Sequence, residues 1–256
     1  MASAGGTTIN TPILLRLLEH SLHTSFDLFQ NEALDRLEDA IPTSVVDEYT
    51  GRKRVRKVCL GDMRVARIRK LLESGFGVTR SKMQVEFHEA FLAATSRHLY
   101  MDDNDVNWAK VKAQQGWKDT RSVVLCQTPR RFGKTWSVGL FIAAYVVCVS
   151  GSEQSIFSTG KRASSKMLEL IKGFVQKVVD PKDIVKSNAE ILVLNHRDGK
   201  KSLVNSYPAA SKTLRGSGGD VLWLEEAAFM PPSLFFEGKL GFAKHFLQSL
   251  FVSILC

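Results

Sequence analysis

The chain has 256 residues, of which 44% are hydrophobic, and a formal net charge of +9. This length is enough to bury a full core in one large domain, and the excess of basic residues favours a polyanionic partner, nucleic acid before membrane. The four cysteines are far apart and form no CxxC pair, which argues against a zinc site and a disulfide framework and favours a reducing compartment, nucleus or cytoplasm.

No segment has the pattern of a secretory signal peptide or of a membrane-spanning helix. The first residues lack the charged start and apolar centre of a signal peptide. The longest apolar run, 138–149, is shorter than the roughly 20 residues that cross a bilayer. We therefore expect a soluble protein with no membrane partner.

The N-terminal part is predicted to be helical and then basic. Leucines recur at helical spacing through residues 11–40, and Pro42 follows them, which predicts a pair of packing helices. Residues 51–70 contain nine lysines and arginines and one acid. Such a run can follow a phosphate backbone, act as a nuclear import signal or form a solvated face. The DNA contacts expected from it are Arg52, Lys53, Arg54, Arg56 and Lys57.

A further helix is predicted over "MQVEFHEAFLAATSRHLY", with Phe87 and Phe91 on its inward side. Gln84 and His88 on this helix are candidates for contact with a nucleotide base. Isolated polar residues on such helices are more often structural, so both interpretations stay open.

From Arg121 onward, strands and helices alternate. Strands are predicted at "SVVLCQ", "SIFST" and "DVLWLEE", with helices up to about residue 149 and at "KRASSKMLELIKGFVQKVV". "AEILVLNH" and "KSLVNSYP" flank the turn "RDGK" and predict a hairpin. The alternation predicts an α/β fold with a mainly parallel sheet and helices on both faces. We divide the chain into an N-terminal region (1–75), this domain (76–237) and an atypical tail (238–256).

The segment "TPRRFGKTW" joins the first of these strands to the helix that follows it. In a phosphate-binding loop, backbone N–H groups and a helix N-terminus surround the phosphates, a lysine adds charge and a Ser/Thr hydroxyl binds Mg²⁺. Gly133, Lys134 and Thr135 have the residue types and spacing for these roles, although Thr128 stands where the first glycine is usual. The strand–loop–helix context predicts a P-loop NTPase. The fold that we expect is the RecA-like (ASCE) class, with a helical region before it.

Two carboxylates, Glu225 and Glu226, end the predicted strand "DVLWLEE". Ligands of α/β sheets bind at the carboxyl ends of the strands, so both acids should face the loop. We expect Glu225 to hold Mg²⁺ through water and Glu226 to orient and deprotonate the attacking water. An acid positioned for water favours ATP hydrolysis over kinase chemistry, and the chain contains no N/T-K-x-D-like motif of a GTPase.

The two segments "TPRRFGKTW" and "VLWLEEAAF" resemble the ATPase half of the large terminase subunit, the DNA-packaging motor of tailed bacteriophages and herpesviruses. The string P-R-R-x-G-K-T-W is similar to the herpesvirus form. "STGKRASSKMLELI" and "LRGSGGD" resemble the family's segments after the second strand and before the acidic strand. The resemblance covers roughly residues 80–237.

This resemblance implies a site for ATP and Mg²⁺. It implies that Arg130 contacts the γ-phosphate in cis, that Lys134 and Thr135 bind phosphate and Mg²⁺, and that Glu226 is the catalytic base. The residues then expected at the nucleotide are Thr128, Pro129, Arg130, Arg131, Phe132, Gly133, Lys134, Thr135 and Gln84.

The resemblance also implies partners. They are double-stranded DNA, a portal, a small terminase subunit and further copies of the chain in a homo-oligomeric ring, in a host nucleus or cytoplasm. Arg131 is expected to brace the loop or face DNA, and Arg215 to sense the nucleotide.

Two departures from the family pattern are expected to matter. Glu225 stands where the family usually has aspartate, and the extra methylene moves the carboxylate by about 1–1.5 Å, so we expect reduced activity. After Glu237 the chain no longer resembles the family and contains no acid for a nuclease site. We therefore expect the sheet to end at the acidic strand with an unpaired edge. A gene-model error, a decayed gene or a genuine short member with its own C-terminal helix would explain the change.

Two other functions stay open. A helicase-like DNA-dependent ATPase would share the nucleotide site but would need a second RecA-like domain. A decayed, endogenised viral relic would bind nucleotide or DNA without turnover.

Overall fold

The computed structural model describes residues 59–121, 123–128, 133–209, 219–226 and 230, together with the backbone of strands at 44–46, 53–55 and 250–255. The chain forms two compact units, Met1–Val58 and Cys59–Cys256. The candidate site lies in the second unit.

In the first unit, strand β1 (Ser44–Val46) pairs antiparallel with strand β2 (Lys53–Val55). Two residues of the basic run, Lys53 and Arg54, are therefore strand residues. The helices predicted over 11–40 lie outside the described residues, as do Arg52, Arg56 and Lys57.

The second unit contains, among the described residues, helices α2 (Leu60–Lys70), α3 (Lys82–Leu99), α4 (Trp108–Gln115), α5 (Lys134–Cys148) and α6 (Lys161–Val175), with a π-helical turn η1 (Leu71–Gly75) after α2 and a 3-10 turn η2 (Pro181–Asp183). Side chains cap the first turns of α2 and α3. Ser81 and Gln84 form a reciprocal capping box at α3, and the Asp103 carboxylate accepts hydrogen bonds from the first N–H groups of α2. No helix in the described part of the chain is long and apolar enough to span a bilayer.

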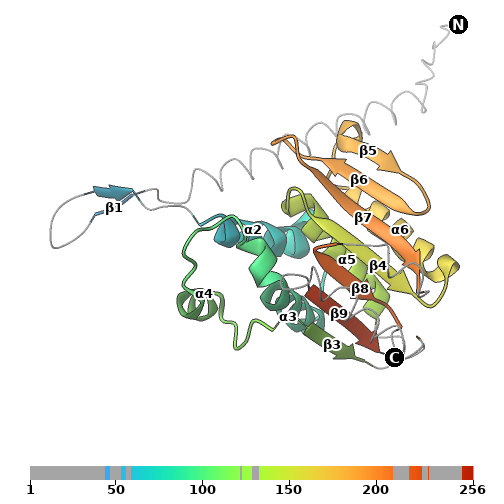
Figure 1. The fold of residues 1–256 in the computed structure, drawn as a ribbon, viewed down its shortest axis with the longest axis horizontal. Coiled ribbons are helices and arrows are strands. Elements are labelled where there is room, and N and C mark those ends of the chain that lie inside the picture. Colours follow the sequence, from blue (N-terminus) through green and yellow to red (C-terminus); the bar gives the residue numbers. More distant parts are fainter. Residues whose placement is uncertain are drawn as a thin grey trace, which may run out of the picture. The chain divides into compact units, whose positions relative to one another are not determined.

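Within the described residues, a seven-stranded sheet runs in the order β3-β9-β8-β4-β7-β6-β5 (Figure 1). Its strands are β3 (Val123–Gln127), β4 (Glu153–Ser158), β5 (Ile184–Ser187), β6 (Ile191–Asn195), β7 (Lys201–Pro208), β8 (Val221–Leu224) and β9 (Leu250–Leu255). In this order, each neighbouring pair from β3 to β7 is parallel. The β7–β6 and β6–β5 pairs are antiparallel. The mainly parallel sheet and the β6–β7 hairpin are confirmed, and β5 was not predicted.

Strand β9 corrects the expectation that the sheet ends at the acidic strand. It lies between β3 and β8 and pairs in parallel with both, with Phe251 aligned to Val123 on one side and to Leu222 on the other. An apolar run such as "LFVSIL" suits a parallel strand that has neighbours on both edges. The acidic strand β8 is consequently an interior strand, and β9 separates it from the strand that leads into the loop.

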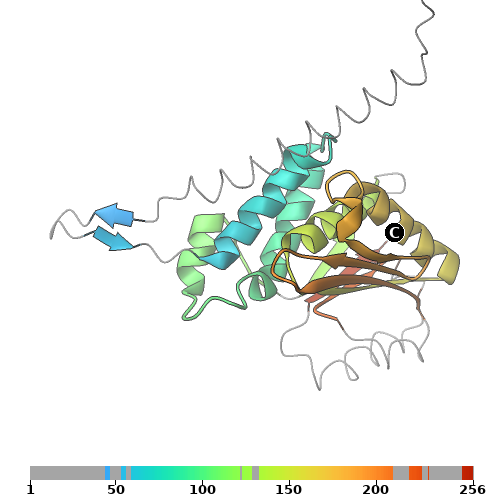
Figure 2. The same cartoon turned by 90° about the horizontal axis from the view of Figure 1, so that it is seen from above.

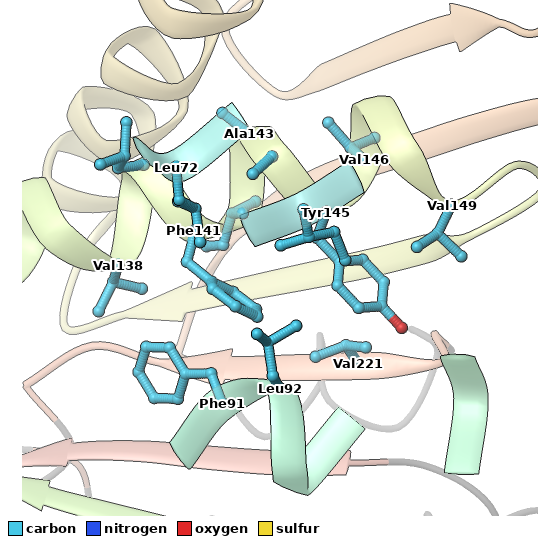
Figure 3. Packing of buried hydrophobic residues seen from close by; sticks show 14 of the residues in the cluster. Leu72, Phe91, Leu92, Val138, Phe141, Ala143, Tyr145, Val146, Val149 and Val221 are labelled. Atoms are coloured by element: carbon cyan, nitrogen blue, oxygen red, sulfur yellow. The ribbon is translucent and has the colours of Figure 1, made fainter. Parts of the chain in front are cut away.

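Helices α3, α5 and α6 pack on one face of this sheet (Figure 2). Phe91 from α3, Phe141 and Tyr145 from α5 and Val221 from β8 meet in the core beneath them (Figure 3). Leu222 alternates with its neighbours along β8, so it faces the opposite side of the sheet, and it is fully buried as well. Both faces of β8 are therefore covered, as is usual for a parallel strand of an α/β sheet.

Trp223 joins three elements in this core. Its ring centroid lies 5.3 Å from that of Phe91 and 5.8 Å from that of Phe141, and its indole N–H donates to Gln154 Oε1 at 3.0 Å. Trp223→Phe should therefore lower the free energy of unfolding by about 2–3 kcal/mol, because it opens a cavity and removes the donor to a buried amide oxygen. Urea-induced equilibrium unfolding measures this loss.

Trp117→Phe is the matched control. Trp117 is also buried, but its indole nitrogen has no hydrogen-bond partner among the described residues. The exchange there removes volume and no hydrogen bond, so it should cost clearly less. Equal losses for the two variants would mean that the Trp223–Gln154 hydrogen bond adds nothing to stability.

Candidate functional site

The end of β3 and the start of α5 form the first half of the candidate site. Thr128 follows β3 directly, and Gly133 is the residue before the first turn of α5. Gly133 has a φ of +80°, a left-handed conformation that costs other residues about 1–2 kcal/mol. Its carbonyl accepts the first hydrogen bond of the helix, from Ser137 N at 2.9 Å. The strand and helix on either side of the predicted loop are confirmed, and residues 129–132 lie outside the described residues.

Lys134 and Thr135 open α5 at the carboxyl edge of the sheet. The N–H groups of a first helical turn have no partner within the helix, and they carry a partial positive charge. Lys134 is half-buried, and its charge acts on Glu225. These features make the start of α5 suitable for an anion such as phosphate.

Glu225 forms the second half of the site. It follows β8, and its backbone N–H donates to Phe157 O on β4 at 2.9 Å. Its side chain is buried, and Glu225 Oε1 accepts a hydrogen bond from the Thr135 hydroxyl. The structure thus brings together the two side chains that were predicted to be metal ligands. The extra methylene of glutamate does not prevent this contact, although aspartate is usual here in the family that the sequence resembles.

The surroundings of Glu225 change its proton affinity. Burial raises its pKa above the ordinary value, the hydrogen bond from Thr135 opposes this effect, and the nearby charge of Glu226 raises the pKa further. A divalent cation beside this carboxylate would favour the ionised form and release any bound proton. The described residues contain no group of three or more His, Cys, Asp or Glu side chains suited to a metal ion. A Mg²⁺ ion needs only one or two protein ligands when substrate phosphates and water complete its shell.

Glu226 differs from its neighbour in exposure and in backbone conformation. It is half-buried and has a φ of +56°, which is uncommon for a residue other than glycine. Its Oε2 accepts a hydrogen bond from Thr159 Oγ1 at 3.3 Å. Thr159 comes directly after β4, the neighbour of β8. Sequence reasoning missed Thr159, because a threonine after a strand becomes informative only when the neighbouring strand is known.

Helix α3 lies beside the start of α5. Gln84 Oε1 accepts from Ser81 N at 2.9 Å, and a Cβ atom added at Gly133 would lie 3.8 Å from Gln84 Nε2. One turn further along each helix, His88 meets Ser137. The predicted base-reading residue Gln84 is therefore next to the last glycine of the loop, with its amide oxygen bonded to its own helix cap.

His88 is fully buried and has partners on both ring nitrogens. Its Nε2 lies 2.9 Å from Ser137 O and 2.8 Å from Ser137 Oγ, and its Nδ1 lies 3.1 Å from Arg80 NH1. Arginine only donates, so Nδ1 accepts and the proton of the neutral ring is on Nε2, which donates to Ser137. Burial lowers the pKa of His88 to about 4, consistent with a neutral ring. The hydrogen bonds of His88 thus link α3 to α5. Of the two interpretations of His88, the structural one fits these contacts.

No protein-family model matches the sequence, and no curated protein matches it either. Among solved structures, the chain is similar to the large terminase ATPase domain of Thermus phage P74-26, with 15% identity and a TM-score of 0.40 over 51% of this chain and 58% of that one. It is also similar to the large terminase of a second thermophilic bacteriophage in complex with ADP, with 12% identity and a TM-score of 0.42 over 58% of this chain and 38% of that one. The match thus spans little more than half of the first structure's chain and well under half of the second's.

Proposed function

We propose that this chain binds and hydrolyses ATP as the ATPase domain of a terminase-like motor that packages viral double-stranded DNA into capsids. The observation that carries the proposal is the hydrogen bond between Thr135 and Glu225. It joins a hydroxyl in the first turn of α5 to a carboxylate at the tip of β8, two groups that are 90 residues apart in the sequence. Hydroxyl, carboxylate and helix N-terminus together suit a nucleotide phosphate with Mg²⁺.

Each group at the site has a distinct task in this proposal. The N–H groups of the first turn of α5 and the Lys134 ammonium bind the β- and γ-phosphates. The Thr135 hydroxyl binds Mg²⁺ directly, and Glu225 holds the ion through water. Arg130 offsets the charge that develops on the γ-phosphate, as the family resemblance implies. Gln84 contacts the base with its amide NH₂ group, because its oxygen is bonded to Ser81 N.

Glu226 acts on the attacking water. The water oxygen bonds to the γ-phosphorus while the bond to the β–γ bridging oxygen breaks, and Glu226 takes a proton from the water. ADP and inorganic phosphate are the products. Glu226 suits this role because it is only half-buried, so its side chain keeps access to water.

Translocation of DNA is the part of the proposal that depends on partners. The resemblance in sequence and the charge of +9 support a polyanionic track. The contacts proposed for the duplex are Arg52, Lys53, Arg54, Arg56 and Lys57. A portal, a small terminase subunit and a ring of identical chains complete the proposed machine.

The whole chain should release phosphate from Mg-ATP, and linear double-stranded DNA should increase the rate at low salt. Phosphate release is followed with and without a blunt duplex, over a range of salt concentrations, and duplex unwinding is measured in the same samples. Stimulation by the duplex without unwinding supports the packaging motor. Unwinding would support a helicase instead, and salt-sensitive DNA binding without phosphate release would support a relic.

A further inference from the structure

Strands β4 and β8 are neighbours, and the segments that follow them stay in contact. Their last aligned pair is Phe157 with Leu224, and the N–H of Glu225 then donates to Phe157 O at 2.9 Å. Beyond this backbone bond, the Thr159 hydroxyl donates to Glu226 Oε2 at 3.3 Å. A side-chain contact thus continues the pairing of the two strands to the residue proposed as the base.

Glu226 has a strained backbone conformation that the surrounding structure must maintain. A φ of +56° puts this residue in the left-handed region, where a side chain costs about 1–2 kcal/mol. Such conformations concentrate at functional sites, where the surrounding structure maintains them. This conformation turns the backbone at Glu226, just after β8. The hydrogen bond from Thr159 then holds the Glu226 carboxylate in place.

Among the described residues, the Thr159 hydroxyl neither caps a helix nor donates a hydrogen bond to a group other than Glu226. The residue that precedes α6 is Gly160, and no side chain caps this helix. Thr159 is itself exposed, so it contributes little to the core. Within the described part of the chain, this hydroxyl donates to Glu226 Oε2.

We propose that Thr159 is a positioning residue that holds Glu226 in the orientation needed to take the proton from the attacking water. The inference rests on the ATP hydrolysis proposed above. A carboxylate has two oxygens and about four lone-pair sites, so Oε2 can accept from Thr159 while Oε1 faces the water. Thr159 contacts neither nucleotide nor water in this role. Its loss should therefore slow the chemical step and leave nucleotide binding intact.

The test compares Thr159→Val, which keeps the shape and removes the hydroxyl, with Thr159→Ser, which keeps the hydroxyl. Single-turnover hydrolysis gives the rate of the chemical step, and calorimetric titration gives the affinity for Mg-ATP. Thr159→Val should slow hydrolysis about 10-fold, and Mg-ATP affinity should stay within about 2-fold, as expected for a lost positioning contact. Thr159→Ser should restore most of the rate.

The same exchange at Thr95 is the matched control. Thr95 is buried in α3, and its hydroxyl donates to Phe91 O at 2.9 Å, away from the site. Thr95→Val should leave hydrolysis unchanged. A second test uses Glu226→Gln as background, where adding Thr159→Val should slow hydrolysis no further, because two residues that act as a unit are not additive.

The possible outcomes separate the two proposals. If the unaltered chain hydrolyses ATP and Thr159→Val does so at the same rate, the positioning role is wrong and the ATPase stands. If Thr159→Val weakens Mg-ATP binding as much as it slows hydrolysis, Thr159 contributes to binding and the positioning role is again wrong. If the unaltered chain neither binds nor hydrolyses Mg-ATP, the proposed function fails and the positioning role fails with it.

Discussion

Replacing Glu226 by glutamine should lower the rate of ATP hydrolysis by about a hundredfold or more, with Mg-ATP binding retained. The amide has nearly the shape of the carboxylate but does not accept a proton from water, and positioned general bases contribute about 10²–10⁴-fold. Phosphate release at saturating Mg-ATP measures the rate, and calorimetric titration measures the binding. Among the variants considered, we expect this one to have the largest effect on the rate of the chemical step.

The same chemical change at Glu190 is the control. Glu190 is exposed and pairs with Lys161 at 2.6 Å, and exposed ion pairs contribute little to stability. Glu190→Gln should leave hydrolysis unchanged. A Glu226→Gln variant that hydrolyses ATP at the unaltered rate would remove Glu226 as the base. The neighbouring Glu225 would then be the carboxylate to examine.

Replacing Lys134 by alanine should weaken Mg-ATP binding about a hundredfold or more. The ammonium is the point charge that the proposal places at the β- and γ-phosphates, and a hydrogen bond to a charged group contributes about 1.5–3 kcal/mol. Removing contacts to two phosphates should reach the upper part of that range or exceed it. Calorimetric titration of the folded variant with Mg-ATP measures the loss.

Lys166→Ala serves as the control for Lys134, because Lys166 is an exposed lysine on α6. It should bind Mg-ATP with the affinity of the unaltered chain. If Lys134→Ala also binds with that affinity, the phosphate site is not at the start of α5. The roles proposed for Thr135 and Glu225 would then fall as well, because they depend on a nucleotide in that place.

The two adjacent glutamates have different environments, and these environments suit them to different roles. Glu225 is buried with its carboxylate against Thr135, and burial raises its pKa. Such a group suits a cation, which removes the cost of its buried charge. Glu226 is half-buried and bonded to Thr159 at the end of the neighbouring strand. It suits exchange of a proton with water.

The elements that carry the site follow from local pattern. An apolar strand, a loop with Gly133, and an apolar helix can be read directly from "SVVLCQTPRRFGKTW", because strand and helix periodicities differ and glycine marks a left-handed residue. The acids after "DVLWL" identify the tip of a second strand for the same reason. Glu225 and Thr135 could be predicted to meet, because the carboxyl ends of parallel strands share one edge of a sheet. The assignments of the base, the lysine and Arg130 remain predictions.

Other features depended on which strands are neighbours, and no local pattern contains that information. The run "LFVSIL" at the end of the chain is apolar in the sequence, but only the tertiary structure inserts it as β9 between β3 and β8. Thr159 became part of the site because β4 lies next to β8, and His88 became the link between α3 and α5 because Ser137 faces it. Local residue patterns indicated the types of the elements that carry the site and the chemistry at their ends, since both depend on residues close together in the chain, but they did not reveal β5 or β9. Strand order and the partners of Glu226 and His88 came only from the folded structure, since these depend on contacts between residues tens of positions apart.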